Sequence, residues 1–423
     1  MKKILVISYV GLMSTSPNGR TMKSLIQGFP KDKVSCFCSI GSCDKNVAKS
    51  IYKVSNIDAK NSFLRLKEYG GVIDASEDEG SYSEQEVQKG KKCPWKYLLK
   101  ELVWKFGKWN GKNLKEWLLD QKVDGVVYMY GDSSSLQDFA VYVSEFLSVP
   151  LVVYSCEDYC FKDYNYINFK DKNIPFKIYQ KMSKASTEKL FKRASALVCN
   201  SDDLAEKYKE KYGINKTCTI MMASNMEFSN NITQAGSQID ITYLGSLGNV
   251  RVKPLCEIAE AIADFDNVVL NIYGEENNKE NIDIMNNYAN IKYHGFVSYE
   301  KVKQVMYASH LLIEAIDNDS YIKKDKRYGF STKYADSFAC GTPFFVYAPL
   351  EIIETKFALD NNCAFVAETK DKLKDVLCDA IFNEEKRLER VKNARIVTEK
   401  YFDEENNIKK FNDLIEDVCK NNK

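Results

Sequence analysis

Four polar residues that could bind a phosphate-bearing ligand stand close together near position 330. They are Ser331, Thr332, Lys333 and Asp336, and a glycine-containing turn and an apolar run follow them. Ser331 suits the N-cap position, which predicts a helix from position 332 to about position 340. In such a helix Thr332, Lys333 and Asp336 share one face.

This arrangement suits a nucleoside diphosphate. The free N–H groups of the first helical turn, the helix dipole and the ammonium of Lys333 all favour phosphate oxygens. Asp336, one turn deeper, can accept hydrogen bonds from a ribose diol. The alternative is an ordinary helix on which Lys333 and Asp336 form a solvated ion pair.

Further cationic residues could complete this site. Arg327, preceded by two lysines, adds positive charge just before the predicted helix. The segment 243–253, YLGSLGNVRVK, follows an apolar run, and Gly245 leaves its backbone open. Arg251 or Lys253 could then bind a diphosphate, and the forked guanidinium of an arginine matches phosphate oxygens well.

Three acidic residues and a Gly-Arg pair occupy similar places in the first half. Asp132 follows one apolar run, and Glu157 and Asp158 follow another, where a carboxylate could meet a sugar hydroxyl or an attacking nucleophile. Gly19 and Arg20 follow the first apolar run and could meet an anion. The alternative for each is a plain loop with solvated side chains.

The elements that must position these residues are two series of continuous apolar runs, as expected for strands buried in parallel sheets. The first series comprises residues 4–10, 34–39, 125–130, 150–155, 196–200 and 218–222, and the second comprises 239–245, 268–274, 291–296, 311–315, 343–348 and 364–368. Amphipathic helical patterns alternate with them. Such sheets bind ligands outside the carboxyl ends of their strands, which is where the candidate residues fall.

Two doubly wound α/β domains are therefore predicted. Their expected limits are 1–224 for an N-terminal domain, 225–238 for a polar linker, 239–395 for a C-terminal domain and 396–423 for a C-terminal helix that could cross back.

Composition narrows the class of protein. The 423 residues carry a formal net charge of +1, which gives no electrostatic case for nucleic acid as a partner. Thirteen cysteines without zinc-finger spacing, and only two histidines, predict reduced, mostly buried thiols rather than a metal site. No run approaches the ~20 apolar residues of a transmembrane helix. We expect a cytoplasmic protein.

A basic segment holds every tryptophan of the chain. It spans residues 89–120 and contains Trp95, Trp104, Trp109 and Trp117. Tryptophan and lysine favour the membrane interface, so residues 89–117 could contact the inner face of the plasma membrane. The alternative is two amphipathic helices packed on the sheet, with Trp104 and Trp117 in the core.

The stretch ADSFACGTP resembles the E-A-x-A-C-G-x-P segment of GT-B glycosyltransferases, notably glycosyltransferase family 4. Asp336 stands where that family has a ribose-binding glutamate. Tyr328 replaces the family's second glutamate, which contacts the donor sugar. The segment GFSTKYADSFACG resembles the corresponding segment of a subgroup of bacterial capsule and surface-polysaccharide transferases. The segments NGRT and EDY and residues 297–315 also resemble this family.

This resemblance implies two Rossmann-like domains that face a cleft, with C-terminal helices. It also implies a retaining, metal-independent and cofactor-free hexosyl transfer from a nucleotide-sugar to a glycan or lipid-linked acceptor. Arg251 and Lys333 would stabilise the diphosphate, and Arg20, Arg327, Tyr328 and Ser331 would line the donor site. An inverting reaction would instead need Asp132, Glu157 or Asp158 as the base. The alternatives are a catalytically silent GT-B partner subunit and a GT-B nucleotide-sugar epimerase.

Overall fold

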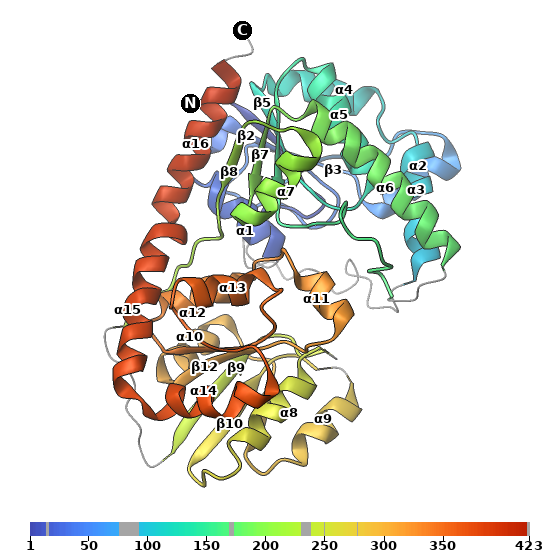
Figure 1. The fold of residues 1–423 in the computed structure, drawn as a ribbon. Helices are drawn as coiled ribbons and strands as arrows, with labels where there is room; N and C mark the ends of the chain where they lie inside the picture. The colour runs from blue at the N-terminus through green and yellow to red at the C-terminus, as the bar shows by residue number, and fades with distance from the viewer. Residues whose placement is uncertain are drawn as a thin grey trace. The chain divides into compact units, whose positions relative to one another are not determined.

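The computed structural model describes residues 1–13, 17–75, 93–168, 173–229, 238–248, 250–276 and 278–420. The chain forms two compact units. Unit 1 contains Met1–Met222 and Glu404–Lys423, and unit 2 contains Ala223–Asp403. Each unit is built around its own β-sheet (Figure 1).

Unit 1 contains an eight-stranded sheet in the order β4-β3-β2-β1-β5-β6-β7-β8. All neighbouring strands are parallel except β4, which runs antiparallel to β3. The strands are β1 (Ile4–Ile7), β2 (Val34–Cys38), β3 (Ser50–Lys53), β4 (Gly71–Ile73), β5 (Gly125–Met129), β6 (Leu151–Ser155), β7 (Ala196–Cys199) and β8 (Thr217–Thr219).

The central strands of unit 1 follow directly from the sequence. Every residue of β1, β2, β5, β6 and β7 is buried, which explains their uninterrupted apolar character. The sequence analysis missed β3 and β4. β4 is the edge strand of the sheet and β3 lies beside it. These strands have only three and four residues and are partly exposed, so they lack a long apolar run.

Helices cover both faces of this sheet. The helices of unit 1 are α1 (Pro17–Ile26), α2 (Asn56–Arg65), α3 (Pro94–Phe106), α4 (Lys112–Gln121), α5 (Ser134–Phe146), α6 (Ile174–Arg193), α7 (Asp202–Tyr212) and α16 (Glu404–Lys420). On one face α1 and α16 pack against each other, with the rings of Phe29 and Phe411 6.2 Å apart. On the other face Phe37 of β2 packs against Phe139 of α5, and α3 lies between α2 and α6.

Three of the four tryptophans belong to the core of unit 1. Trp104, Trp109 and Trp117 are buried, and their indole N–H groups donate to Asn56, to the Trp104 carbonyl and to Ser50, respectively. Only Trp95 is exposed. The core interpretation therefore holds for Trp104 and Trp117. Residues 89–92 of the predicted membrane segment lie outside the described residues.

Unit 2 contains a six-stranded parallel sheet in the order β11-β10-β9-β12-β13-β14. Strand order reverses between β9 and β12, and ligands of such sheets bind at this switch point, beyond the carboxyl ends of the strands. The strands are β9 (Ile239–Leu244), β10 (Val268–Tyr273), β11 (Ile291–Gly295), β12 (Leu311–Ala315), β13 (Phe344–Tyr347) and β14 (Phe365–Ala367).

The helices of unit 2 enclose this sheet. They are α8 (Val252–Ala261), α9 (Lys279–Asn286), α10 (Tyr299–Ala308), α11 (Ser320–Lys326), α12 (Thr332–Ala339), α13 (Ile353–Asp360), α14 (Lys370–Phe382) and α15 (Glu384–Tyr401). Helices α8, α9 and α14 share one apolar core with the strands. Helix α12 packs against α15 through rings that include Phe338 and Phe402. No helix within the described residues has the length and apolar composition to cross a membrane.

Candidate functional site

Charged side chains of three segments converge at the carboxyl edge of the sheet in unit 2. Arg251 caps the N-terminus of α8, Glu314 lies in β12, and Lys333 lies in the first turn of α12. We call these three residues the charge cluster. The strands β9 and β12, which lead into it, are the neighbours at the switch point of the sheet.

Glu314 is the centre of the charge cluster. Its side chain is 3% exposed, and its two oxygens serve two cations. Oε1 accepts from Arg251 Nη1 and from the backbone N–H of Ala315 (3.1 Å), while Oε2 lies 3.1 Å from Lys333 Nζ. Arg251 Nη1 also donates to the Ala315 carbonyl at 2.7 Å. The glutamate therefore fixes both cations at one point of the sheet edge.

The ionisation of these groups follows from their mutual contacts. Burial opposes the charge on Glu314, but Arg251 and Lys333 outweigh it and hold the pKa of Glu314 below its ordinary value. Burial would lower the pKa of both cations, and the Glu314 carboxylate more than compensates, so the pKa of each is raised. The charge cluster thus holds two positive charges and one negative charge.

A glycine makes room for Lys333. Gly245, directly after β9, has a φ of +140°, and a Cβ on it would lie 2.5 Å from Lys333 Nζ. Only a glycine lets the lysine side chain cross this loop without displacement. Lys333 Nζ reaches the hydroxyl of Tyr243 at 3.3 Å and lies 4.8 Å from its ring centroid. Its side chain remains 31% exposed.

The helix predicted after Ser331 is present as α12. The hydroxyl of Ser331 accepts a hydrogen bond from the backbone N–H of Lys333 (3.3 Å), as an N-cap should. The Ser331 N–H itself donates to Glu354, a buried residue of α13. One turn into the helix, Asp336 is also buried, and its Oδ1 accepts from the Ser224 hydroxyl at 2.7 Å. The described structure includes the backbone of Thr332 but not its side chain.

The remaining predicted residues of unit 2 lie around the charge cluster. Lys253 points to solvent and pairs with Asp317 at 3.2 Å. Arg327 is exposed and its guanidinium lies 5.2 Å from the ring centroid of Tyr328. The Arg327 carbonyl accepts from the N–H of Ile353, which holds the segment before α12 against α13.

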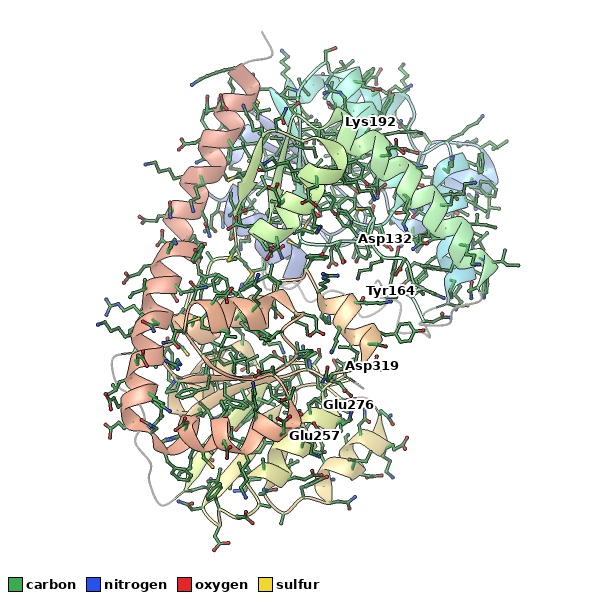
Figure 2. All side chains as sticks on the ribbon, viewed as in Figure 1. Asp132, Tyr164, Lys192, Glu257, Glu276 and Asp319 are labelled. Carbon is green, nitrogen blue, oxygen red and sulfur yellow. The ribbon has the colours of Figure 1, made fainter. Side chains whose placement is uncertain are left out.

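The predicted residues of unit 1 lie beyond the carboxyl ends of its own sheet. Asp132 follows β5 (Figure 2) and accepts from the Tyr166 hydroxyl at 3.2 Å. Burial raises the pKa of Asp132, against hydrogen bonds from Tyr179 and Tyr166 that lower it. Asp158 is buried and lies 3.4 Å from the ammonium of Lys162.

Gly19, Arg20 and Glu157 are the remaining predicted residues of unit 1. Gly19 and Arg20 lie inside α1, which begins at Pro17. Proline suits the first helical turn because its fixed φ is helical and its missing N–H has no partner there. Glu157, directly after β6, accepts the Tyr208 hydroxyl with its backbone carbonyl at 2.6 Å.

Sequence analysis missed the two buried glutamates of unit 2, Glu314 and Glu354. A signal for the first was present: Glu314 is an acid inside the otherwise apolar run LLIEA. In unit 1 it also missed Lys100 of α3, whose Nζ donates to the Tyr9 hydroxyl at 3.1 Å beside the end of β1.

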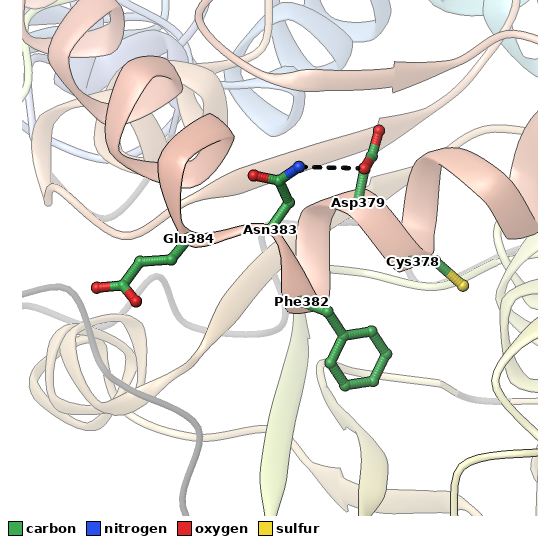
Figure 3. A pocket seen from close by; sticks show the side chains of 5 residues that line it. All are labelled: Cys378, Asp379, Phe382, Asn383 and Glu384. Carbon is green, nitrogen blue, oxygen red and sulfur yellow. Dashed lines mark hydrogen bonds between the residues drawn. The ribbon is translucent and has the colours of Figure 1, made fainter.

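The structure also has a surface hollow between α14 and α15 (Figure 3). It is lined by Cys378, Asp379, Phe382, Asn383 and Glu384. The carbonyl of Ile381 accepts from His310, the residue just before β12, so the hollow lies at the amino edge of the sheet. The charge cluster is at the opposite, carboxyl edge. Within the described residues, no group of three His, Cys, Asp or Glu side chains could hold a metal ion.

Comparisons with known proteins extend the description of the fold. No protein-family model and no curated protein matches the sequence. HepE of Anabaena, solved with UDP and glucose, is 11% identical over 99% of this chain and 100% of its own, with a TM-score of 0.63. Sucrose-phosphate synthase of Thermosynechococcus elongatus is 11% identical over 99% and 100% of the two chains, with a TM-score of 0.63. For TarM the identity is 10%, the coverage 98% and 99%, and the TM-score 0.60.

These solved structures are GT-B glycosyltransferases, and this chain shares their fold. The predicted α/β class with two Rossmann-like domains is therefore confirmed.

Proposed function

We propose that this protein is a glycosyltransferase that moves a sugar from a nucleotide-diphosphate sugar to an acceptor. One observation carries the proposal: Arg251 and Lys333 are held on the buried Glu314 at the carboxyl edge of unit 2, beside a glycine loop and the N-terminus of α12. The fold, shared with GT-B glycosyltransferases, supports the same class of reaction.

The charge cluster is suited to the chemistry of sugar transfer. Cleavage of the bond between the sugar and the diphosphate leaves negative charge on the phosphate oxygens. Lys333, whose side chain is partly exposed, and the guanidinium of Arg251 can stabilise that charge, as fixed donors do for oxyanions. Arg251 and Lys333 would stabilise the phosphate charge in place of a metal ion, so we propose a metal-independent reaction. Asp336, one turn deeper in α12, would bind the ribose diol.

We further propose retention of configuration at the sugar carbon, which needs no enzymic base for the acceptor hydroxyl. Two of the three candidate bases of unit 1 support this. Asp158 is committed to an ion pair with Lys162, and burial disfavours the ionised form of Asp132. The proposed acceptor is a glycan or a lipid-linked sugar of bacterial surface polysaccharide, and the sugar transferred is a hexose.

A panel of UDP-, GDP- and CMP-sugars tests the class of protein. We expect a UDP- or GDP-sugar to bind and to be hydrolysed slowly without acceptor, with release of the nucleoside diphosphate, whereas the CMP-sugars, which have a single phosphate, serve as the negative control. Calorimetry measures the binding, and chromatography measures the release. If the product is an epimerised nucleotide-sugar, the protein is an epimerase and not a transferase. If the protein binds none of the nucleotide-sugars, it is a silent partner subunit.

We also propose that unit 1 contacts the membrane surface through α3. Trp95, Leu99 and Phe106 lie on one side of this helix and are 53%, 51% and 61% exposed. Lys96 and Lys105 are exposed beside them, and the one acid of the helix, Glu101, is buried. Helix α6 packs on α3 and exposes Ile174, Lys177, Ile178 and Lys181. Apolar and cationic side chains in this combination suit an anionic lipid surface.

Vesicle flotation tests this surface. We expect the protein to float with vesicles that contain anionic phosphatidylglycerol, and less with neutral ones. Replacement of Trp95, Leu99 and Phe106 by serine should abolish flotation because it removes the apolar part of the contact. The matched control replaces three similarly exposed apolar residues of unit 2, Phe382, Leu388 and Ile396, by serine and should float normally. Equal flotation of both triple variants would contradict the proposal.

A further inference from the structure

Glu354 occupies the N-terminus of α12. Its Oε1 accepts the backbone N–H of Ser331, which is one of the donors that a helix leaves without an intrahelical partner. A phosphate would use the same group. Two further contacts fix α13 against the segment before α12: the Ile353 N–H donates to the Arg327 carbonyl (3.1 Å), and Glu351 pairs with Lys323 (3.0 Å). Glu354 is therefore held in this place.

The surroundings of Glu354 are both buried and charged. The residue is 4% exposed. Its carboxylate faces charged or titratable groups from four elements or their ends: Glu314 of β12, Arg251 before α8, Lys326 of α11 and Tyr334 of α12. The Tyr334 hydroxyl is buried and makes no hydrogen bond within the described residues. Glu354 thus adds a second carboxylate to a site that already has one.

We propose that Glu354 takes the place of a donor phosphate oxygen in the ligand-free protein, and that binding of the donor diphosphate neutralises Glu354 by proton uptake. This inference rests on the proposed function of the charge cluster. Glu354 would compete with the substrate for the Ser331 N–H, beside the cations that would bind the same diphosphate.

Charge balance gives the physical reason. The charge cluster has a net charge of +1, because one carboxylate faces two cations. Ionised Glu354 reduces the net charge of these four residues to zero, and Lys326, which also faces Glu354, brings it back to +1. An incoming diphosphate diester would add two negative charges and make the site negative. Like charges in a buried site disfavour joint ionisation, so the carboxylate takes up a proton from solvent as the diphosphate binds. The neutral acid then has an O–H that can donate to a phosphate oxygen.

The proton needed for this exchange is available near neutral pH. Burial raises the pKa of Glu354 to about 7, and the neighbouring Glu314 adds to the rise, while the Ser331 N–H, Arg251 and Lys326 oppose it. Below this pH Glu354 is already neutral, and the diphosphate binds without proton uptake. Above it each binding event must take up a proton. The affinity should therefore fall as pH rises, by at most about tenfold per pH unit for one proton.

Calorimetric titration of the full chain with the UDP- or GDP-sugar that binds tests the proposal between about pH 6 and about pH 8.5. Both phosphates of such a donor are esterified, so the ligand itself does not titrate like a phosphate monoester in this range. Two buffers with different ionisation enthalpies give the number of protons taken up. We expect uptake to rise toward one proton per donor above pH 7, with a parallel loss of affinity.

The variant Glu354→Gln separates charge from hydrogen bonding. Its amide oxygen can still accept the Ser331 N–H, but it carries no charge. We expect no linked proton uptake from this position, and an affinity at pH 8 that matches the low-pH affinity of the native protein. The control is Glu399→Gln, which changes an exposed glutamate of α15 that pairs with Arg395 (3.0 Å) and should keep the native pH profile.

Each result decides the question. A native protein that binds the donor without proton uptake would overturn the proposal, and this measurement does not depend on the folding of any variant. Proton uptake that persists in a folded Glu354→Gln variant would assign the proton to another group and also overturn it. A native protein that binds no nucleotide-sugar contradicts the proposed function itself, which is a different outcome.

Discussion

Replacement of Lys333 by methionine is expected to lower the rate of sugar transfer by about 10²–10³-fold, the usual effect of removing one fixed donor to a developing oxyanion. Methionine keeps a straight side chain that can pass Gly245, so the loop need not move. Negative charge grows on the diphosphate as the bond breaks. The turnover number should therefore fall more than the affinity for the donor, because the ammonium matters most in the transition state.

Steady-state kinetics with the donor identified in the panel measure this effect. The control is Lys370→Met, which removes an exposed lysine of unit 2 that pairs with Glu257 and Glu260 away from the charge cluster. It should change the rate by less than about twofold, as expected for a surface ion pair. Lys333→Met with native turnover would show that the diphosphate does not bind at the charge cluster.

Replacement of Glu314 by glutamine is expected to destabilise unit 2 by about 3–5 kcal/mol, the usual cost of breaking a buried ion pair by removing one partner. The glutamine would leave Arg251 and Lys333 close together without a counter-ion. A bound diphosphate can supply the missing negative charge. Saturating donor should therefore stabilise this variant more than it stabilises the native protein.

The measurement must report on unit 2. All four tryptophans lie in unit 1, so their fluorescence is unsuitable. Hydrogen exchange of peptides from β9 and β12 measures the opening free energy of the correct sheet. The control is Glu257→Gln, a less buried glutamate that accepts the Tyr347 hydroxyl at 2.7 Å and should cost about 1 kcal/mol. Equal exchange in the native protein and Glu314→Gln would falsify the role of Glu314 as the buried counter-ion.

Local sequence patterns were sufficient for most of the fold. Eleven of the twelve predicted runs contain a whole strand, and the run 218–222 overlaps the last two residues of β8. The central strands were predictable because a strand covered on both faces is apolar at most positions. The helix after Ser331 was predictable because its N-cap bond joins residues two positions apart. The short strands β3 and β4 were not predictable, since partial exposure removes the apolar run on which the prediction depends.

For the site, residue types that suit phosphate identified Arg251, Lys333 and Gly245, and the structure places all three together in unit 2. Their partners could not be found in the same way. Glu314 is 63 positions from Arg251 in the chain, and Glu354 is 23 positions from Ser331. No periodic pattern links residues at such distances. The ion pair of Asp158 with Lys162 could have been predicted from the sequence, because the two residues lie four positions apart.

The amino-acid sequence by itself determined the order of the strands and helices, the two α/β series and the cationic residues available for a diphosphate, because these depend on local periodicity and on side-chain chemistry. Only the tertiary structure decided which charges face one another. The strand order of unit 2 brings β9 beside β12 and places Glu314 between Arg251 and Lys333. The packing of α13 against the start of α12 adds Glu354. Burial then sets the protonation of these carboxylates, and burial is a property of the folded chain.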